Sequence, residues 1–118
     1  AGLKQFIADQ IDMEVTGEAA TGAETVALVR AQPFDVVLLD ISMPDRNGVD
    51  TLKSLRQITP ELPVLILSAY SETQYAVNLL RAGAAGYVNK EAASTQLVSA
   101  VRTVVQGRKY VSPALAQI

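Results

Sequence analysis

The chain has 118 residues, of which 49% are apolar and 19% charged, and its net charge is −2. This balance predicts one globular domain without a basic surface for nucleic acid or anionic lipid. Cysteine and histidine are both absent, which excludes disulfides, thiol or imidazole catalysis and the usual zinc sites. Any metal would need oxygen ligands, as magnesium does. The apolar runs are too short to span a membrane, and we expect a cytoplasmic protein.

Helices and strands alternate along the sequence. Apolar stripes at helical spacing predict helices over residues 1–11, 23–31, 49–58 and 71–81, and a last helix that ends before Gly107. Apolar or alternating runs predict strands at 13–19, 35–40, 64–67 and 87–89. This alternation is typical of βαβ units, and it predicts an α/β fold with a central parallel sheet.

Three predicted strands run directly into a polar residue: Asp40, Ser68 and Lys90. The carboxyl ends of parallel strands lie at one edge of a sheet, so these side chains are expected to converge. A carboxylate can attack phosphorus without a general base, while a cation and a hydroxyl meet the phosphoryl oxygens. The three residues therefore predict a phosphoryl-transfer site.

The same residues sit inside longer motifs. These are the run 38–44 (Leu-Leu-Asp-Ile-Ser-Met-Pro), the pair 47–48 (Asn-Gly), the pair 68–69 (Ser-Ala), the run 82–87 (Ala-Gly-Ala-Ala-Gly-Tyr) and Lys90. In this order they resemble the receiver domain of two-component response regulators, from residue 1 to about 112. The run 107–113 (Gly-Arg-Lys-Tyr-Val-Ser-Pro) is most similar to the subfamily with a C-terminal LuxR-type (FixJ/NarL-type) helix-turn-helix. The resemblance implies a flavodoxin-like three-layer sandwich.

The resemblance also implies roles for individual residues. Asp40 is the expected phosphoacceptor, which receives a phosphoryl group from a sensor histidine kinase. Ser68 and Lys90 are expected to contact the phosphoryl group, and Tyr87 is expected to act as an aromatic switch. Ser42 and Tyr70 occupy the positions that modulate dephosphorylation.

Magnesium is the cofactor that the resemblance implies, held by the Asp40 side chain and the Ser42 backbone carbonyl. The family's first strand and the two acidic residues at its end have no counterpart in this chain, so we expect weakened metal binding. The absence of the first strand would expose the edges of its two former neighbours, the strands at 13–19 and 35–40. Three outcomes follow: direct pairing of those strands, a strand supplied by another chain, or residues that the given sequence omits.

The domain assignment that follows is a receiver over residues 1–118, with 108–118 beginning a linker to a DNA-binding domain outside this chain. By itself the chain is expected to bind neither nucleic acid nor membrane. The expected activity is self-catalysed phosphoryl transfer and dephosphorylation rather than turnover of a separate substrate. The alternative is a phosphorylation-impaired module that assembles through unpaired strand edges, as a homodimer or a strand-exchanged oligomer.

Simpler interpretations stay open for each site residue. Asp40 could be a turn residue, and Ser68 could cap the helix that follows it. Lys90 could be a solvated charge at a strand end, and Tyr87 an interior aromatic residue with no switching role.

Overall fold

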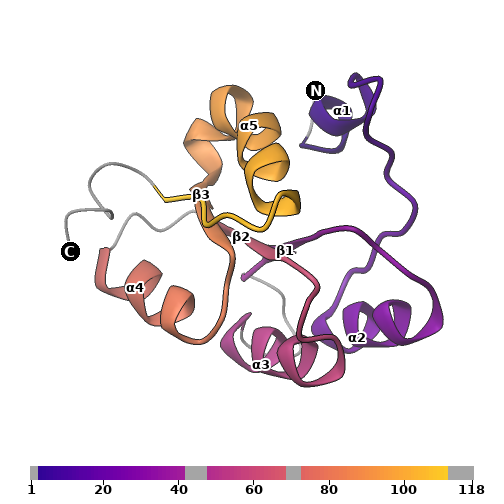
Figure 1. Ribbon diagram of the computed structural model, residues 1–118, viewed down its shortest axis with the longest axis vertical. Coiled ribbons are helices and arrows are strands. Elements are labelled where there is room, and N and C mark those ends of the chain that lie inside the picture. Colours follow the sequence, from indigo (N-terminus) through magenta and orange to yellow (C-terminus); the bar gives the residue numbers. More distant parts are fainter. Residues whose placement is uncertain (1–2, 42–47, 69–72, 112–118) are drawn as a thin grey trace.

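The computed structural model describes residues 3–41, 48–68 and 73–111. Within these ranges the chain forms one parallel sheet, whose strands are β1 (Val37–Asp40), β2 (Val64–Ser68) and β3 (Gly86–Asn89) (Figure 1). The strands lie in the order β1-β2-β3, with β2 in the middle. The prediction of an α/β fold with a parallel sheet is confirmed.

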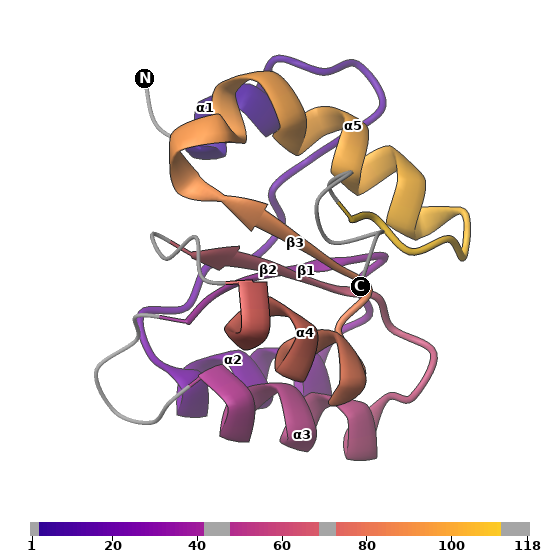
Figure 2. The same ribbon diagram turned by 90° about the vertical axis from the view of Figure 1, so that its left-hand side faces the viewer.

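Helices cover both faces of the sheet. Figure 2 shows α1 and α5 on one face and α2, α3 and α4 on the other, which gives the expected three layers. None of the described helices is long and apolar enough to cross a membrane. The helices are α1 (Leu3–Ala8), α2 (Gly22–Ala31), α3 (Gly48–Ile58), α4 (Thr73–Arg81), the short 3-10 helix η1 (Lys90–Ala92) and α5 (Ala93–Val105).

The continuous apolar runs of the strands explain the two halves of the core. Side chains of a strand alternate between the faces of the sheet, so a strand covered on both faces needs apolar residues at every position. In β2 all five residues are buried. Val64 and Ile66 join the core under α3 and α4, whereas Leu65 and Leu67 join the core under α5.

The segment 13–19 is not a strand, and this prediction was wrong. Met13 and Val15 pack against the core under α5, but the segment forms no ladder with β1. Side-chain interactions hold it instead. The ammonium of Lys4 contacts the Glu18 carboxylate at 2.8 Å, and the Gln32 side-chain amide donates to the Thr16 carbonyl at 3.2 Å. Direct pairing of the two strands is thereby excluded.

The end of α5 follows the sequence prediction. Gly107 adopts a positive φ of 85° directly after the C-cap residue Gln106. The amide of Gly107 donates to the Val104 carbonyl and the amide of Arg108 to the Thr103 carbonyl, the pattern of a Schellman motif. This turn sends the chain back toward the sheet.

The chain that leaves this turn covers the outer edge of β3. The Tyr110 amide donates to the Ala85 carbonyl at 2.9 Å, and the Tyr87 amide donates to the Tyr110 carbonyl at 3.3 Å. A Cβ atom on Gly86 would lie 2.8 Å from that same carbonyl oxygen, so a glycine permits the close approach. The first residues after α5 are therefore attached to the sheet.

Candidate functional site

Asp40 and Lys90 form an ion pair at the carboxyl edge of the sheet. Asp40 is the last residue of β1, and Lys90 directly follows β3 as the first residue of η1. The Lys90 ammonium donates to Asp40 Oδ2 at 2.5 Å, although the two residues are 50 positions apart in the sequence. The parallel sheet brings them together because both strands end at the same edge.

The pair is open to solvent. The side chain of Lys90 is 34% exposed and that of Asp40 is 37% exposed. A carboxylate at this position can be approached by a dissolved phosphodonor or by a partner protein. The neighbouring ammonium supplies a fixed positive charge where a phosphoryl group on Asp40 would place its negative charge.

The local structure on the Lys90 side is fixed by a cap. The Asn89 side-chain oxygen accepts a hydrogen bond from the Glu91 amide at 2.9 Å, which starts η1 directly at the end of β3. The same helical segment continues into α5. The position of the Lys90 backbone is therefore tied both to the sheet and to α5. We did not predict this role of Asn89, although an Asn before a helix start is a recognisable signal.

Ser68 and Tyr87 lie close to the pair in the sheet. Ser68 ends β2 and is fully buried, and its strand register places it beside Asn89. Tyr87 is 7% exposed in β3 and packs in the core under α3 and α4. The convergence of three strand ends at one edge agrees with the sequence prediction. Ser42 and Tyr70 lie outside the described residues.

A metal ion is not provided for by the described residues. They contain no group of three or more Asp, Glu, His or Cys side chains that could hold one. Asp40 brings one carboxylate to the edge, and an oxygen of that carboxylate accepts a hydrogen bond from the Lys90 ammonium. Magnesium requires near-octahedral oxygen ligation, which this set does not supply.

Comparison with known families decides how this edge is understood. Residues 1–102 match the model of the response regulator receiver domain. The chain belongs to this family. Receiver domains generally bind Mg²⁺ and interact with histidine kinases, and the position of Asp40 in the receiver is the carboxyl edge of its parallel sheet.

Relatives of known name are response regulators. The chain is 35% identical over 117 residues to the response regulator UvrY of Escherichia coli, and 34% identical over 116 residues to the response regulator GacA of Pseudomonas aeruginosa. These alignments cover 99% and 98% of the chain but 54% of each relative, so the chain spans about half their length.

A solved structure supports the same assignment. A LuxR-family two-component response regulator from an Aurantimonas species superposes with a TM-score of 0.90 and 30% identity. The superposition covers 97% of this chain and 81% of that one. The receiver fold predicted from the sequence motifs is thus confirmed.

Proposed function

We propose that this receiver accepts a phosphoryl group on Asp40 from a sensor histidine kinase. The observation that supports the proposal most directly is the ion pair between Asp40 and Lys90 at the open carboxyl edge. If Asp40 were only a turn residue and Lys90 only a solvated charge, there would be no reason for the ends of β1 and β3 to hold the two side chains in contact. The pair combines a nucleophilic oxygen with a cation that stabilises the charge of the product.

The reaction is a transfer between two nucleophiles. An Asp40 carboxylate oxygen attacks phosphorus, and the bond from phosphorus to the donor's imidazole nitrogen breaks. The ammonium of Lys90 then pairs with a phosphoryl oxygen instead of the bare carboxylate. Because Lys90 begins η1, which continues into α5, this exchange of partners reaches the helix that packs on β3 and β2.

Further roles in the proposal rest on the family resemblance. Ser68 contacts the phosphoryl group, Tyr87 changes exposure as Ser68 moves, and Ser42 and Tyr70 modulate dephosphorylation. Transfer and hydrolysis are catalysed by the receiver itself. The output is transcription regulation in the cytoplasm, through a DNA-binding domain joined after residues 108–118, of which Tyr110 pairs with β3.

Acetyl phosphate or a phosphorylated kinase domain tests the proposal. The receiver is expected to gain the mass of one phosphoryl group as an acid-labile adduct, and Asp40→Asn is expected to abolish it. Asp9→Asn is the matched control, because Asp9 is an exposed carboxylate outside this edge. An adduct that survives Asp40→Asn, or that Asp9→Asn removes, would contradict the assignment.

A second candidate is a receiver with impaired phosphoryl transfer. The lack of an acidic cluster among the described residues favours it. If metal binding is weak, the phosphorylation rate would rise only at high Mg²⁺ concentrations. A Mg²⁺ titration of the phosphorylation rate distinguishes the two candidates, since an intact receiver saturates at low concentration.

A further inference from the structure

A small hollow lies at the amino end of β2 and β3, at the opposite end of the sheet from Asp40 and Lys90. Its walls are the loop that leads from α3 into β2, the turn that leads from α4 into β3, and the chain that leaves α5. Its volume is about 180 Å³. Small-molecule pockets measure roughly 300–1,000 Å³, so this hollow fits one chemical group rather than a whole ligand of that kind.

The charged side chains that line the hollow are mostly cationic. They are Arg56 at the end of α3, Arg108 and Lys109 after α5, and Glu61 in the loop before β2. Three cations and one carboxylate give the lining a charge of +2, whereas the whole chain has a charge of −2. The hollow therefore reverses the overall sign of the molecule and favours an anion.

Two of the cations are held in place by backbone carbonyls. Arg56 Nη1 donates to the Leu62 carbonyl at 3.2 Å, and Lys109 Nζ donates to the Ala84 carbonyl at 3.0 Å. A Cβ atom on Gly83 would lie 3.0 Å from Arg56 Nε, so a glycine allows the guanidinium group to pack on this turn. Arginine has five N–H donors and lysine three, so both groups keep donors for a ligand. Because they are already oriented, binding costs them little side-chain entropy.

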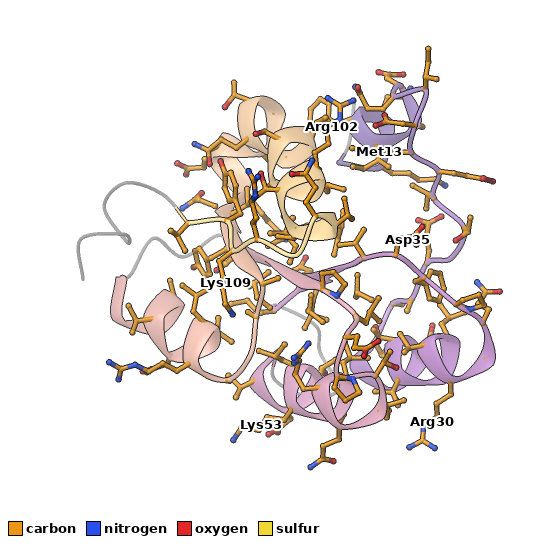
Figure 3. All side chains as sticks on the ribbon, viewed as in Figure 1. Met13, Arg30, Asp35, Lys53, Arg102 and Lys109 are labelled. Carbon is orange, nitrogen blue, oxygen red and sulfur yellow. The ribbon has the colours of Figure 1, made fainter. Side chains whose placement is uncertain are left out.

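The third cation, Arg108, is exposed and available. Its amide donates to the Thr103 carbonyl, which fixes the backbone beside the hollow. Its side chain makes no hydrogen bond or ion pair in the part of the chain that the structure describes. Figure 3 shows Lys109 between α5 and the layer of α3 and α4, whereas Arg30 and Lys53 point outward from α2 and α3. The fold thus gathers three cations here and leaves other cations apart.

We propose that this hollow binds a phosphate group, either as free phosphate or as a phosphomonoester. A phosphate group carries a charge of about −1.5 to −2 at neutral pH and three strong acceptor oxygens. Its charge complements the lining, and its oxygens can meet donors from three side chains. A carboxylate has two oxygens, which a single arginine can satisfy. The inference rests on Arg56, Arg108 and Lys109 and is independent of the phosphoryl chemistry of Asp40.

The probes are inorganic phosphate and glycerol 3-phosphate, titrated into the full 118-residue chain at constant ionic strength. We expect saturable NMR shifts at the amides of Gly83, Gly107 and Arg108 and at Arg56 Nε–H. Equal affinities would identify free phosphate as sufficient, and tighter binding of the ester would identify an attached phosphate. Shifts that do not saturate, or saturable shifts confined to Asn89 and Lys90 at the opposite end of the sheet, would overturn the proposal.

Acetate tests the preference for phosphate over a carboxylate. Loss of one charge-assisted hydrogen bond corresponds to about tenfold in affinity, so acetate is expected to bind at least about tenfold more weakly than phosphate. Acetate that binds as tightly at the same ionic strength would overturn the assignment of the ligand class.

The charge of the ligand is tested by pH. A phosphomonoester loses its second proton near pH 6, so glycerol 3-phosphate should bind more tightly at pH 7.5 than at pH 5. The charged groups that face the ligand are Arg56, Arg108, Lys109 and Glu61. Sulfate keeps its charge over this range and reports any change in those groups, so its affinity should stay constant. Equal pH dependence of the two anions would contradict recognition of the phosphate dianion.

An arginine variant tests the available cation. Arg108→Gln is expected to weaken phosphate binding by about two- to fivefold, the range for one exposed charge interaction. Its fold should be unchanged, because the side chain has no partner in the described part of the chain. Arg30→Gln is the matched control, since Arg30 is also exposed but lies outside the hollow. Equal weakening by the two variants would reduce the effect to net charge and overturn the site.

A glutamate variant tests the same site in the opposite direction. Glu61→Gln removes the carboxylate from the lining and is expected to tighten phosphate binding by about two- to fivefold. Glu14→Gln makes the same charge change at an exposed residue outside the hollow and should leave the affinity unchanged. Weaker binding by Glu61→Gln, or equal tightening by both variants, would contradict binding in this hollow.

Discussion

Strands β1 and β3 form the two borders of the sheet, and each leads to one partner of the Asp40–Lys90 pair. Their outer edges differ. The edge of β3 is covered by Tyr110, and three of its four residues are buried. Among the described residues β1 pairs with β2 alone, and only Leu39 among its four residues is buried.

This difference shows that similar apolar sequences need a covering neighbour before they are buried. The functional pair consequently joins a well-covered strand to a poorly covered one. Lys90 is positioned by β3, the Asn89 cap and α5, whereas Asp40 depends on pairing between β1 and β2 alone among the described elements.

The largest expected effect comes from valine-to-alanine substitutions at matched positions of β3 and β1. Val88 of β3 is 1% exposed, whereas Val37 of β1 is only partly buried. Val88→Ala removes two buried methyl groups and leaves a cavity, so we expect a loss of about 2–3 kcal/mol in the free energy of unfolding. Val37→Ala should cost about 1 kcal/mol, because part of its surface is already exposed. Urea denaturation of both variants measures the difference, and equal losses would contradict it.

A steric clash between residue 86 and the Tyr110 carbonyl should detach Tyr110 from the outer edge of β3. The Cβ atom of Gly86→Ala would lie 2.8 Å from the Tyr110 carbonyl oxygen and 2.8 Å from a methyl group of Leu65. We expect a loss of roughly 1–2 kcal/mol in unfolding free energy and faster exchange of the Tyr87 amide.

Gly107→Ala is the control for that variant. It strains a residue with a positive φ, at a cost of about 1 kcal/mol, yet its Cβ would meet nothing within 4 Å. It should lower stability without a selective effect on the Tyr87 amide. Selective exposure of that amide in Gly107→Ala would show that the turn, rather than the contact at Gly86, holds Tyr110 on β3.

The smallest expected effect is a pH dependence of stability in the segment 12–19. The hydrogen bond from Arg102 holds the pKa of Asp12 below its ordinary value of 3.8. The folded state therefore gains stability from Asp12 above pH 3.8, and this contribution is lost as pH falls through the lowered value. Amide exchange at Met13 and Val15 should rise over that acid range while exchange at Tyr87 does not.

Arg102→Gln provides the check on this titration. The Asp12 carboxylate then loses its main partner, and an NMR titration should return its pKa toward 3.8. The side-chain oxygen of Gln10 also loses the hydrogen bond that it accepts from Arg102. An unchanged Asp12 titration would assign the lowered pKa to the backbone instead.

Much of the site could be predicted because its signals are local. Each strand is a continuous apolar run that ends in a polar residue, and parallel pairing places such ends together. This reasoning joined Asp40 to Lys90, and the structure confirms that contact. The functional roles of Ser68 and Tyr87 stay predictions, as do those of Ser42 and Tyr70, which lie outside the described residues.

The prediction for segment 13–19 was wrong, and the pairing of Tyr110 with β3 was not predicted, for a shared reason. Met13 and Val15 alternate with polar residues as in a strand, but pairing also needs an edge within hydrogen-bonding distance. Tyr110 has no strand pattern around it, yet the turn at Gly107 brings its backbone to β3. The periodicity of a segment therefore does not show which distant segment, if any, its backbone pairs with.

The sequence by itself determined the family, the alternation of helices and strands, the apolar cores and the end of α5 at Gly107. These features depend on residue order within one element or on motifs along the chain. Only the tertiary structure decided which strand edges are covered, because that depends on where distant segments lie. It gave β3 a neighbour in Tyr110, since backbone pairing is set by position in space and not by the side chains of the strand alone.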